Sequence, residues 1–184
     1  MVVYGPELFV GEYLRAYTKP TDRVLDVGCG PSLYRDFSRG RYIGLDVTVE
    51  PYGEGVARDV DVIASAQQLP HPDGVFDLVI SKSAFFQFPD PSSALAEMKR
   101  VLKPGGRLIL FDYNRRTQRD LEKKEDTMKP KWTQWGLRRL VRRYGFKECR
   151  LLLPTTRQMS GIERCFRLVN QELRGSWAIV TGIK

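Results

Sequence analysis

Short apolar runs alternate with longer amphipathic stretches along the first 112 residues of this 184-residue chain. Five of these runs have the length and the bounding Gly, Pro or Asp residues of strands: 23–27, 42–46, 60–64, 76–81 and 107–112. Parallel strands need long crossover connections, which are usually helices. The alternation therefore predicts an α/β fold, in which helices cover a mainly parallel sheet.

Helices are predicted before the first strand and within the second half of the chain. Apolar residues recur at helical spacing between Leu8 and Tyr17, and the turn at 19–22 ends that helix. A second helix is expected at 92–102, with Pro91 in its first turn. Thr133 is a plausible N-cap for a third helix.

The remaining second half departs from simple alternation. Gly145 is expected to end the third helix, and 146–153 and 177–183 are expected to be strands. Apolar residues at 162, 165, 166, 169 and 173 predict an extra helix between those strands. The polar stretch 115–130 is expected to be a long connection.

Residues 24–30 form the most informative motif, Val-Leu-Asp-Val-Gly-Cys-Gly, in which an apolar strand runs into a glycine turn that we expect to open a helix. Glycines let backbone N–H groups approach a ligand, and a helix N-terminus favours negative charge. The motif therefore predicts a site for a carboxylate or phosphate. An ordinary turn that contains two glycines is the alternative.

Asp46 ends the second predicted strand, 16 residues after Gly30. A carboxylate there can accept hydrogen bonds from the vicinal hydroxyls of a ribose, so a nucleotide-type cofactor is expected at the carboxyl ends of the strands. A dinucleotide enzyme is the competing interpretation. It is disfavoured because Leu33 stands where the GxGxxG pattern has its third glycine.

Four segments carry a wider resemblance: VLDVGCG from Val24, YIGLD from Tyr42, AQQLPHPDGVFDLVIS from Ala66 and ALAEMKRVLKPGGRL from Ala94. In order and spacing they resemble the class I S-adenosylmethionine-dependent methyltransferases, in the branch that includes many small-molecule enzymes. The resemblance implies a three-layer Rossmann-like fold. Its seven-stranded sheet is mostly parallel, with an antiparallel last strand.

The resemblance also implies S-adenosyl-L-methionine as cofactor, S-adenosyl-L-homocysteine as product and no metal. In a single domain of residues 1–184, 22–112 would form the cofactor-binding half and 113–184 the acceptor side. The glycine turn would pass under the methionine part, Asp46 would hold the ribose, and Ala66 with Gln67 would flank the adenine. Ser81, with Lys82, would lie past the fourth strand at the floor of the cleft. The implied cofactor-binding residues are Asp26, Gly28, Cys29, Gly30, Asp46, Val47, Ala66, Gln67 and Ser81.

No catalytic residue is assigned, because a sulfonium cofactor is already activated and the protein mainly aligns the reactants. Ser65 replaces an acidic residue frequent in the family, and Gln87 replaces a histidine, so no general base follows from the resemblance. If the acceptor must lose a proton, the candidate bases are Tyr4, Tyr13, His71, Asp112 and Tyr113.

The excess positive charge is confined to one stretch. Residues 113–150 hold 13 basic and five acidic residues, which accounts for the whole net charge of +8. The arginines on its helical part are interpreted first as the solvated face of an amphipathic helix. The alternative is that the basic residues neutralise phosphates of RNA, a phosphorylated metabolite or an anionic membrane surface. In that alternative Trp132 and Trp135 could add stacking or interfacial contacts, and core packing is expected for at least one of them. The helical part of the stretch carries Arg138, Arg139, Arg142 and Arg143.

Composition narrows the function classes. Three cysteines without a CxxC pair argue against a disulfide framework or a zinc site. No apolar run approaches the roughly 20 residues that span a bilayer, and no signal-peptide pattern is present, so a cytoplasmic location is expected. Methyl transfer to an acceptor that the sequence does not identify is the favoured function, with an anionic acceptor as one candidate. A catalytically silent cofactor-binding domain that binds nucleic acid or a protein partner is the alternative.

Overall fold

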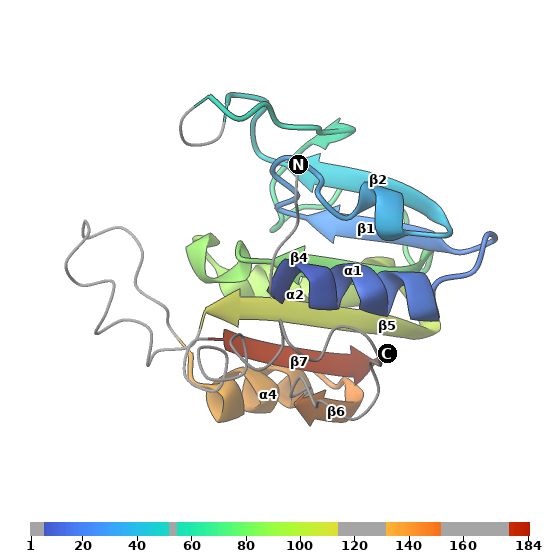
Figure 1. Cartoon of the computed structure of the whole chain (residues 1–184). Helices are drawn as coiled ribbons and strands as arrows, with labels where there is room; N and C mark the ends of the chain where they lie inside the picture. The colour runs from blue at the N-terminus through green and yellow to red at the C-terminus, as the bar shows by residue number, and fades with distance from the viewer. Residues whose placement is uncertain (1–5, 52–54, 114–131, 152–176) are drawn as a thin grey trace, which may run out of the picture.

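A seven-stranded sheet organises the chain, in the order β3-β2-β1-β4-β5-β7-β6 (Figure 1). The computed structural model describes residues 6–51, 55–113, 132–151 and 177–184. The strands are β1 (Arg23–Val27), β2 (Arg41–Asp46), β3 (Val62–Ile63), β4 (Phe76–Lys82), β5 (Leu102–Tyr113), β6 (Lys147–Leu151) and β7 (Trp177–Ile183).

Strand direction follows the expected pattern. β1 pairs in parallel with β2 and β4, β2 pairs in parallel with β3, and β4 pairs in parallel with β5. The last strand, β7, is inserted between β5 and β6 and is antiparallel to both. The carboxyl ends of β1, β2, β4 and β5 therefore lie at one edge of the sheet, on the left in Figure 1.

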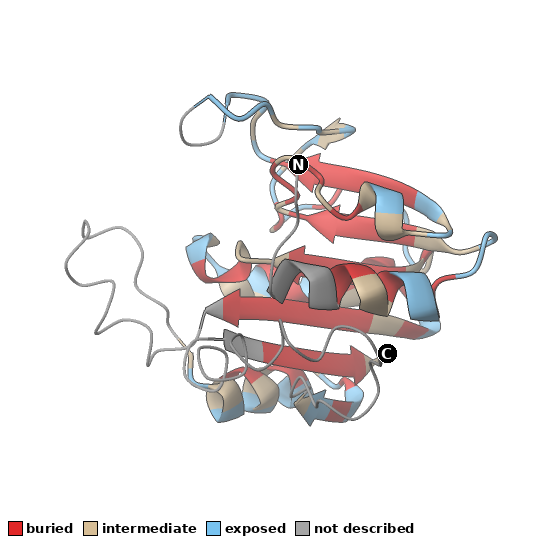
Figure 2. Ribbon diagram, in the orientation of Figure 1, coloured by how far each residue is buried: buried red, intermediate tan, exposed pale blue. Residues whose placement is uncertain are grey.

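Helices cover both faces of the sheet and produce three layers. α1 (Pro6–Tyr17) lies on one face, and α2 (Pro91–Val101) and α4 (Gln134–Arg143) lie on the other (Figure 1). Val10 and Leu14 of α1 are buried against β1, β4 and β5. On the opposite face, Leu95 of α2 and Leu137 of α4 join the larger apolar cluster. Buried residues run along the central strands (Figure 2).

Local sequence signals explain where two of the helices begin and end. The Asp90 carboxylate accepts hydrogen bonds from the backbone N–H groups of Ser92 and Ser93, at 2.9 and 3.2 Å, and caps α2. Thr133 Oγ1 accepts from the N–H of Gly136 at 3.0 Å and caps α4, as predicted. Gly145, with φ of 77°, follows the last turn of α4 and ends it.

The prediction of a helix directly after the glycine turn is wrong. Ser32 adopts φ of 49°, which is incompatible with a continuing right-handed helix, and its hydroxyl donates to the carbonyl of Asp59. The chain passes through turns into the single 3₁₀ turn η1 (Arg35–Phe37). Because no α-helix follows the turn, no helix N-terminus contributes positive charge to this site.

Other predictions differ in extent or fall outside the described residues. β3 is two residues long rather than the five of 60–64, and β5 begins at Leu102 because residues 103–106 form an irregular insertion in its pairing with β4. The connection expected at 115–130 and the helix expected at 162–173 lie outside the described residues. No helix among the described residues is long and apolar enough to cross a bilayer.

Candidate functional site

The neighbouring strands β1 and β2 each carry a buried carboxylate toward the same edge of the sheet. Asp26 is 2% exposed and Asp46 is 7% exposed. Val24 and Tyr42 pack on the α1 side, and side chains alternate along a strand, so Asp26 and Asp46 face that side too. The register places Asp26 opposite Gly44. Two acids thus lie close together in a region with little water.

Asp26 has one satisfied oxygen and one free oxygen. The Tyr42 hydroxyl donates a hydrogen bond to Oδ2, whereas Oδ1 is buried and has no hydrogen-bond partner among the described residues. Burial raises the pKa of this carboxyl to about 7, the Tyr42 hydrogen bond lowers it, and the Asp46 charge raises it. An unsatisfied buried carboxylate oxygen is costly and indicates a missing cationic or hydrogen-bonding ligand.

Asp46 is held by three donors from within the chain. Its Oδ2 accepts from the N–H of Gly30 at 2.9 Å and from Arg58 Nη1 at 2.8 Å. Its Oδ1 accepts from the N–H of Val47 at 2.8 Å. A carboxylate offers about four lone-pair sites, so three bonds leave room for one more donor.

The backbone N–H groups of the glycine turn donate within the protein. Those of Gly28 and Cys29 donate to the carbonyl of Leu45 at 2.8 and 3.1 Å, and that of Gly30 donates to Asp46. This corrects the expectation that these N–H groups receive a carboxylate or phosphate. With two carboxylates beside the turn and no α-helix behind it, the site repels a pyrophosphate, which argues against a dinucleotide.

Glycine is required in the turn at Gly28. Its φ is 77°, and a Cβ there would lie 2.4 Å from the Cβ of Ala84, in the loop after β4. The turn therefore packs tightly against the neighbouring loop.

Cys29, the residue between the two glycines, is buried, and burial raises the pKa of its thiol to about 12. It stays protonated at neutral pH and is a packing residue rather than a nucleophile.

Ser81 lies inside β4 rather than past it. Its hydroxyl donates to the carbonyl of Val27 at 2.8 Å and is 1% exposed. The bond joins the end of β4 to the last residue of β1, so Ser81 stabilises the position from which the glycine turn begins. Lys82 is the last residue of β4.

The residues predicted around the adenine occupy the turn after β3. Ala66 is buried, Gln67 is half-buried and Ser65 is exposed. The N–H of Gln67 donates to Ser65 Oγ at 3.2 Å, so Ser65 supports the turn.

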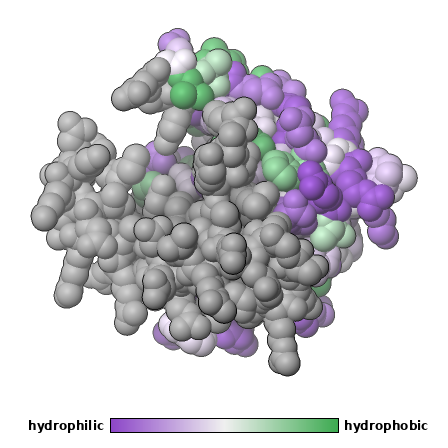
Figure 3. Space-filling model, in the orientation of Figure 1, coloured by the Kyte–Doolittle hydropathy of each residue, from purple (hydrophilic) through white to green (hydrophobic). Residues whose placement is uncertain are grey.

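An exposed apolar group lies near this turn. Apolar side chains gather over the connection from β2 to β3, at the top of Figure 3. The exposed residues there are Val47, Val49, Val56 and Ile63, with relative exposures from 42% to 65%. Exposed apolar side chains of this kind suit the face of a planar ring.

The candidate bases are mostly excluded by position. His71 precedes β4, and Tyr13 accepts a 3.1 Å hydrogen bond from Arg107 at the start of the parallel part of β5, so both lie at the opposite edge from Asp26. Asp112 is fully buried near the carboxyl end of β5. Tyr4 and the side chain of Tyr113 lie outside the part of the chain that the structure describes. Only Asp112 remains at the correct edge among the described candidates.

The two tryptophans have different environments. Trp132 is half-buried and packs against the core, with its ring centroid 6.4 Å from that of Phe85. Trp135 is 68% exposed. Core packing for one tryptophan is therefore confirmed. Gln87 donates to the carbonyl of Ser83 at 3.1 Å, so it stabilises its own loop.

Sequence reasoning missed two residues of the site, Tyr42 and Arg58. The parallel register of β1 and β2 places the Tyr42 hydroxyl at Asp26, and period-two alternation along β2 could have shown that Tyr42 faces that side. No local pattern connects Arg58 to Asp46, because a loop joins them. No cluster of potential metal ligands occurs among the residues whose placement is described.

Several curated proteins are similar in sequence. A demethylmenaquinone methyltransferase of Mycolicibacterium vanbaalenii is 36% identical over 104 residues, which are 54% of this chain and 46% of that protein. The ubiquinone/menaquinone biosynthesis C-methyltransferase UbiE of Vibrio cholerae is 34% identical over 124 residues, 59% of this chain and 48% of that protein. The chain spans about half the length of the curated relatives that it matches.

Solved structures share the fold over nearly the whole chain. The YcgJ protein of Bacillus subtilis has a TM-score of 0.67 at 18% identity, covering 96% of each chain. An S-adenosylmethionine-dependent methyltransferase of Mesorhizobium loti has a TM-score of 0.66 at 19% identity, covering 95% of this chain and 98% of that chain. At these identities the likeness concerns the fold alone.

The mostly parallel sheet with its antiparallel β7 is the fold that these solved structures share. Residues 25–110, 86 of the 184 residues, match the family model described as a methyltransferase domain. Together with the fold, this match supports a class I S-adenosylmethionine-dependent methyltransferase.

Proposed function

We propose that the chain transfers a methyl group from S-adenosyl-L-methionine to an acceptor molecule. The observation that carries this proposal is the buried carboxylate of Asp26, whose Oδ1 has no hydrogen-bond partner among the described residues and which lies near the carboxylate of Asp46. The cofactor brings an α-ammonium group and a sulfonium as cations, one α-carboxylate as its anion, and two ribose hydroxyls as donors. A pocket with two acids complements this set of cations and donors better than it complements phosphates.

Each predicted residue has a role in this proposal. Asp26 accepts from the ammonium end, the turn at Gly28 and Gly30 passes close to the methionine part, and Asp46 accepts from the ribose. The adenine lies against Val47 and the turn at Ala66, with polar contacts from Gln67. Ser81 acts on the site indirectly, because its bond to Val27 supports the turn. Cys29 has a packing role in this proposal, because its small buried side chain fills the space beneath the turn.

When bound, S-adenosyl-L-methionine would supply a methyl group on a positively charged sulfur. The lone pair of the acceptor's nucleophile would form the new bond to the methyl carbon, and the C–S bonding electrons would stay on sulfur as S-adenosyl-L-homocysteine leaves. The chain has three tasks: to hold the donor, to align the nucleophile of the acceptor in line with the methyl group, and to exclude water. If the acceptor must lose a proton, Asp112 is the candidate general base at the carboxyl edge of the sheet, among the residues that the structure describes. The proposal also assigns residues 113–150 to the acceptor side, and their 13 basic and five acidic residues favour an acceptor of anionic character.

The alternative, a cofactor-binding domain without catalysis, is supported by two substitutions. Gln87 stands where a histidine is common, and its side chain is engaged with the carbonyl of Ser83. Ser65 stands where an acid is common, and its hydroxyl accepts from the N–H of Gln67.

Calorimetric titration of the purified chain with S-adenosyl-L-methionine, S-adenosyl-L-homocysteine and NAD tests the cofactor. We expect micromolar affinity for the first two and none for NAD. Asp26→Asn should weaken binding at least about tenfold at pH 8, because the ionic contact between the Asp26 carboxylate and the α-ammonium group of the cofactor is lost. The control Asp36→Asn removes an exposed carboxylate of η1 and should bind as the wild type does. Binding of NAD alone, or equal affinities in both variants, would overturn the proposal.

Transfer itself is measured as S-adenosyl-L-homocysteine produced with a panel of phosphorylated acceptors and their uncharged counterparts. Acceptor-dependent product that Asp46→Ala abolishes supports methyl transfer. Tight cofactor binding without product from any acceptor favours the catalytically silent domain.

A further inference from the structure

The outer surface of α4 and β6 is strongly basic. Within residues 132–151 the only acidic residue is Glu148. The basic residues of the same stretch are Arg138, Arg139, Arg142, Arg143, Lys147 and Arg150, and we call this set, together with Trp135, the basic face. All of its members are exposed except Arg138, which is half-buried.

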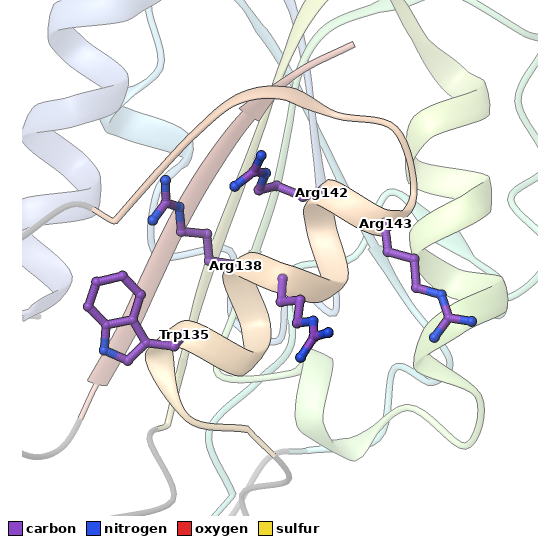
Figure 4. Close-up of a pocket in the computed structure, with 5 residues that line it drawn as sticks. Trp135, Arg138, Arg142 and Arg143 are labelled. Carbon is purple, nitrogen blue, oxygen red and sulfur yellow. The ribbon is translucent and has the colours of Figure 1, made fainter.

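The basic face is fixed in place by the apolar side of α4. Leu137 and Val141 are fully buried against the sheet, so the arginines on either side of them point outward. Arg138 and Arg142 point to one side of the helix and Arg143 to the other (Figure 4). Residues four apart on a helix are neighbours, so the arginines form two rows along the axis.

Two adjoining hollows follow these rows. One is lined by Trp135 and the four arginines of α4, and the other by Arg138, Arg142 and residues 146–150. Because both hollows include Arg138 and Arg142, they form one continuous track over α4 toward β6.

Arg138 anchors the track. Its Nε donates to the carbonyl of Cys149 at 2.9 Å, and its guanidinium lies 5.9 Å from the ring centroid of Trp135. Glu148 offsets little of the positive charge, since its pair with Arg150 is long, at 3.6 Å, and both side chains are more than 60% exposed.

We propose that the basic face binds a single strand of nucleic acid, with phosphates along the arginine rows and a base stacked on Trp135. Guanidinium groups match phosphate oxygens in geometry and charge, and an exposed aromatic ring beside a basic track is the arrangement that single-strand binding uses. This inference does not depend on the proposed methyl transfer.

A membrane surface fits the same charge less well. An interfacial helix inserts its apolar side into the lipid. The apolar side of α4 is already used by the core, which leaves Trp135 as the only large apolar side chain of the basic face. A small phosphorylated molecule would fill one hollow only, whereas the two adjoining hollows suit a chain of phosphates.

One end of the track lies toward the carboxyl edge of the sheet, over β6 and β7 on the face opposite α1. α4 runs antiparallel to β5, so Trp135 in its first turn lies toward the carboxyl edge and Arg143 toward the opposite one (Figure 1). A strand that follows the arginine rows would therefore reach the carboxyl edge at its Trp135 end.

Fluorescence anisotropy with labelled 12-residue oligouridylate and oligothymidylate, without cofactor, tests the inference. The triple variant R139Q/R142Q/R143Q should bind at least about tenfold more weakly at 50 mM salt. Its slope of log affinity against log salt should be shallower by about 2, because three phosphate contacts are removed. Arg138 is retained because it bonds the backbone. W135A should weaken binding with little change in the salt slope.

The matched control is K19Q/R39Q/R41Q, which removes the same charge from exposed residues around the turn before β1 and the start of β2. It should bind within about twofold of the wild type, and thermal melts should show that all variants fold. Equal losses in the two triple variants would mean diffuse charge attraction and would overturn the inference. Absence of oligonucleotide binding at 50 mM salt, or cosedimentation with phosphatidylglycerol vesicles in its place, would also overturn it. A difference between the two oligonucleotides would identify RNA or DNA as the source.

Discussion

The guanidinium of Arg58 lies 2.8 Å from the carboxylate of Asp46, the residue proposed to hold the ribose. Arg58 Nε also donates to the carbonyl of Glu50 at 2.7 Å, so the arginine fastens the connection after β2 onto the site. With Gly30 and Val47 bonded to the same carboxylate, one acceptor position remains for the two ribose hydroxyls. Cofactor binding should therefore displace the Arg58 contact.

Replacing Arg58 with Met should tighten binding of S-adenosyl-L-methionine by about three- to tenfold. The substitution frees an acceptor position and removes a positive charge near a cationic ligand. Calorimetric titration measures the change, and Arg39→Met, an exposed arginine far from Asp46, serves as the control. Weaker binding by the Arg58 variant would show that the arginine prepares Asp46 for the ribose.

Asp26 should make the free protein less stable as pH rises. The pKa of its carboxyl is raised from 3.8 to about 7 in the folded protein, chiefly by burial. The folded state therefore holds a proton that the unfolded state releases near pH 4. The associated stability is complete below pH 4 and is lost as pH rises through 7.

Denaturant unfolding between pH 4 and 8 measures this loss. Asp26→Asn keeps an oxygen for the Tyr42 hydroxyl and cannot ionise, so at pH 8 it should exceed the wild type by ~2–4 kcal/mol in unfolding free energy. Parallel pH profiles of the two proteins would contradict the raised pKa.

Cofactor affinity should increase with pH across the same range. A cationic ligand prefers the ionised form of Asp26, whose pKa in the free protein is about 7. Titrations at pH 6, 7 and 8 should show rising affinity in the wild type. Asp26→Asn should show a flat profile, and a wild-type profile that is also flat would exclude Asp26 from direct contact.

Gly28→Ala should cost ~2–4 kcal/mol of stability and abolish cofactor binding. A side chain at Gly28 suffers both a positive φ and a close approach to Ala84. Gly55 provides a matched control, because its φ is 82° but a Cβ there meets nothing within 4 Å. Gly55→Ala should lose only ~1 kcal/mol. Equal losses at the two positions would mean that the contact with Ala84 is relieved by movement of its loop.

Arg100 should be the stronger of two surface arginines for stability. It bonds Glu97 and Asp73 at 2.7 Å and the carbonyls of Leu69 and His71 at 2.9 and 2.8 Å, so it holds the turn before β4 on α2. Arg100→Met should lower the unfolding free energy by ~1–3 kcal/mol.

Arg15→Met is the control for Arg100. Arg15 makes one ion pair, with Glu12, is 57% exposed, and has its guanidinium 5.0 Å from the ring centroid of Phe37, so its loss should change stability by less than about 1 kcal/mol. Cofactor affinity should be unchanged in both variants, since neither arginine lies at the carboxyl edge. Similar melting temperatures for the two variants would contradict the bracing role of Arg100.

The sequence by itself determined the elements whose signals are local. β1 was predicted residue for residue at 23–27, because its apolar run ends directly before Gly28. Gly28 adopts a positive φ, which glycine tolerates and other residues rarely adopt. The start of α4 was predicted from Thr133, since a cap needs only residues of the same turn. The carboxylates Asp26 and Asp46 were identified from the motifs that contain them.

Only the tertiary structure decided how distant residues meet. Pro31 after the glycine turn suits a helix start, yet the bond from Ser32 to Asp59, 27 residues later, turns the chain away from a helix. Because β4 is parallel to β1, His71, which precedes β4, lies at the edge opposite Asp26. The loop after β2 places Arg58 in contact with Asp46. These relationships depend on strand register and on loop paths, which are set by packing across the whole sheet and are not encoded in any local residue pattern.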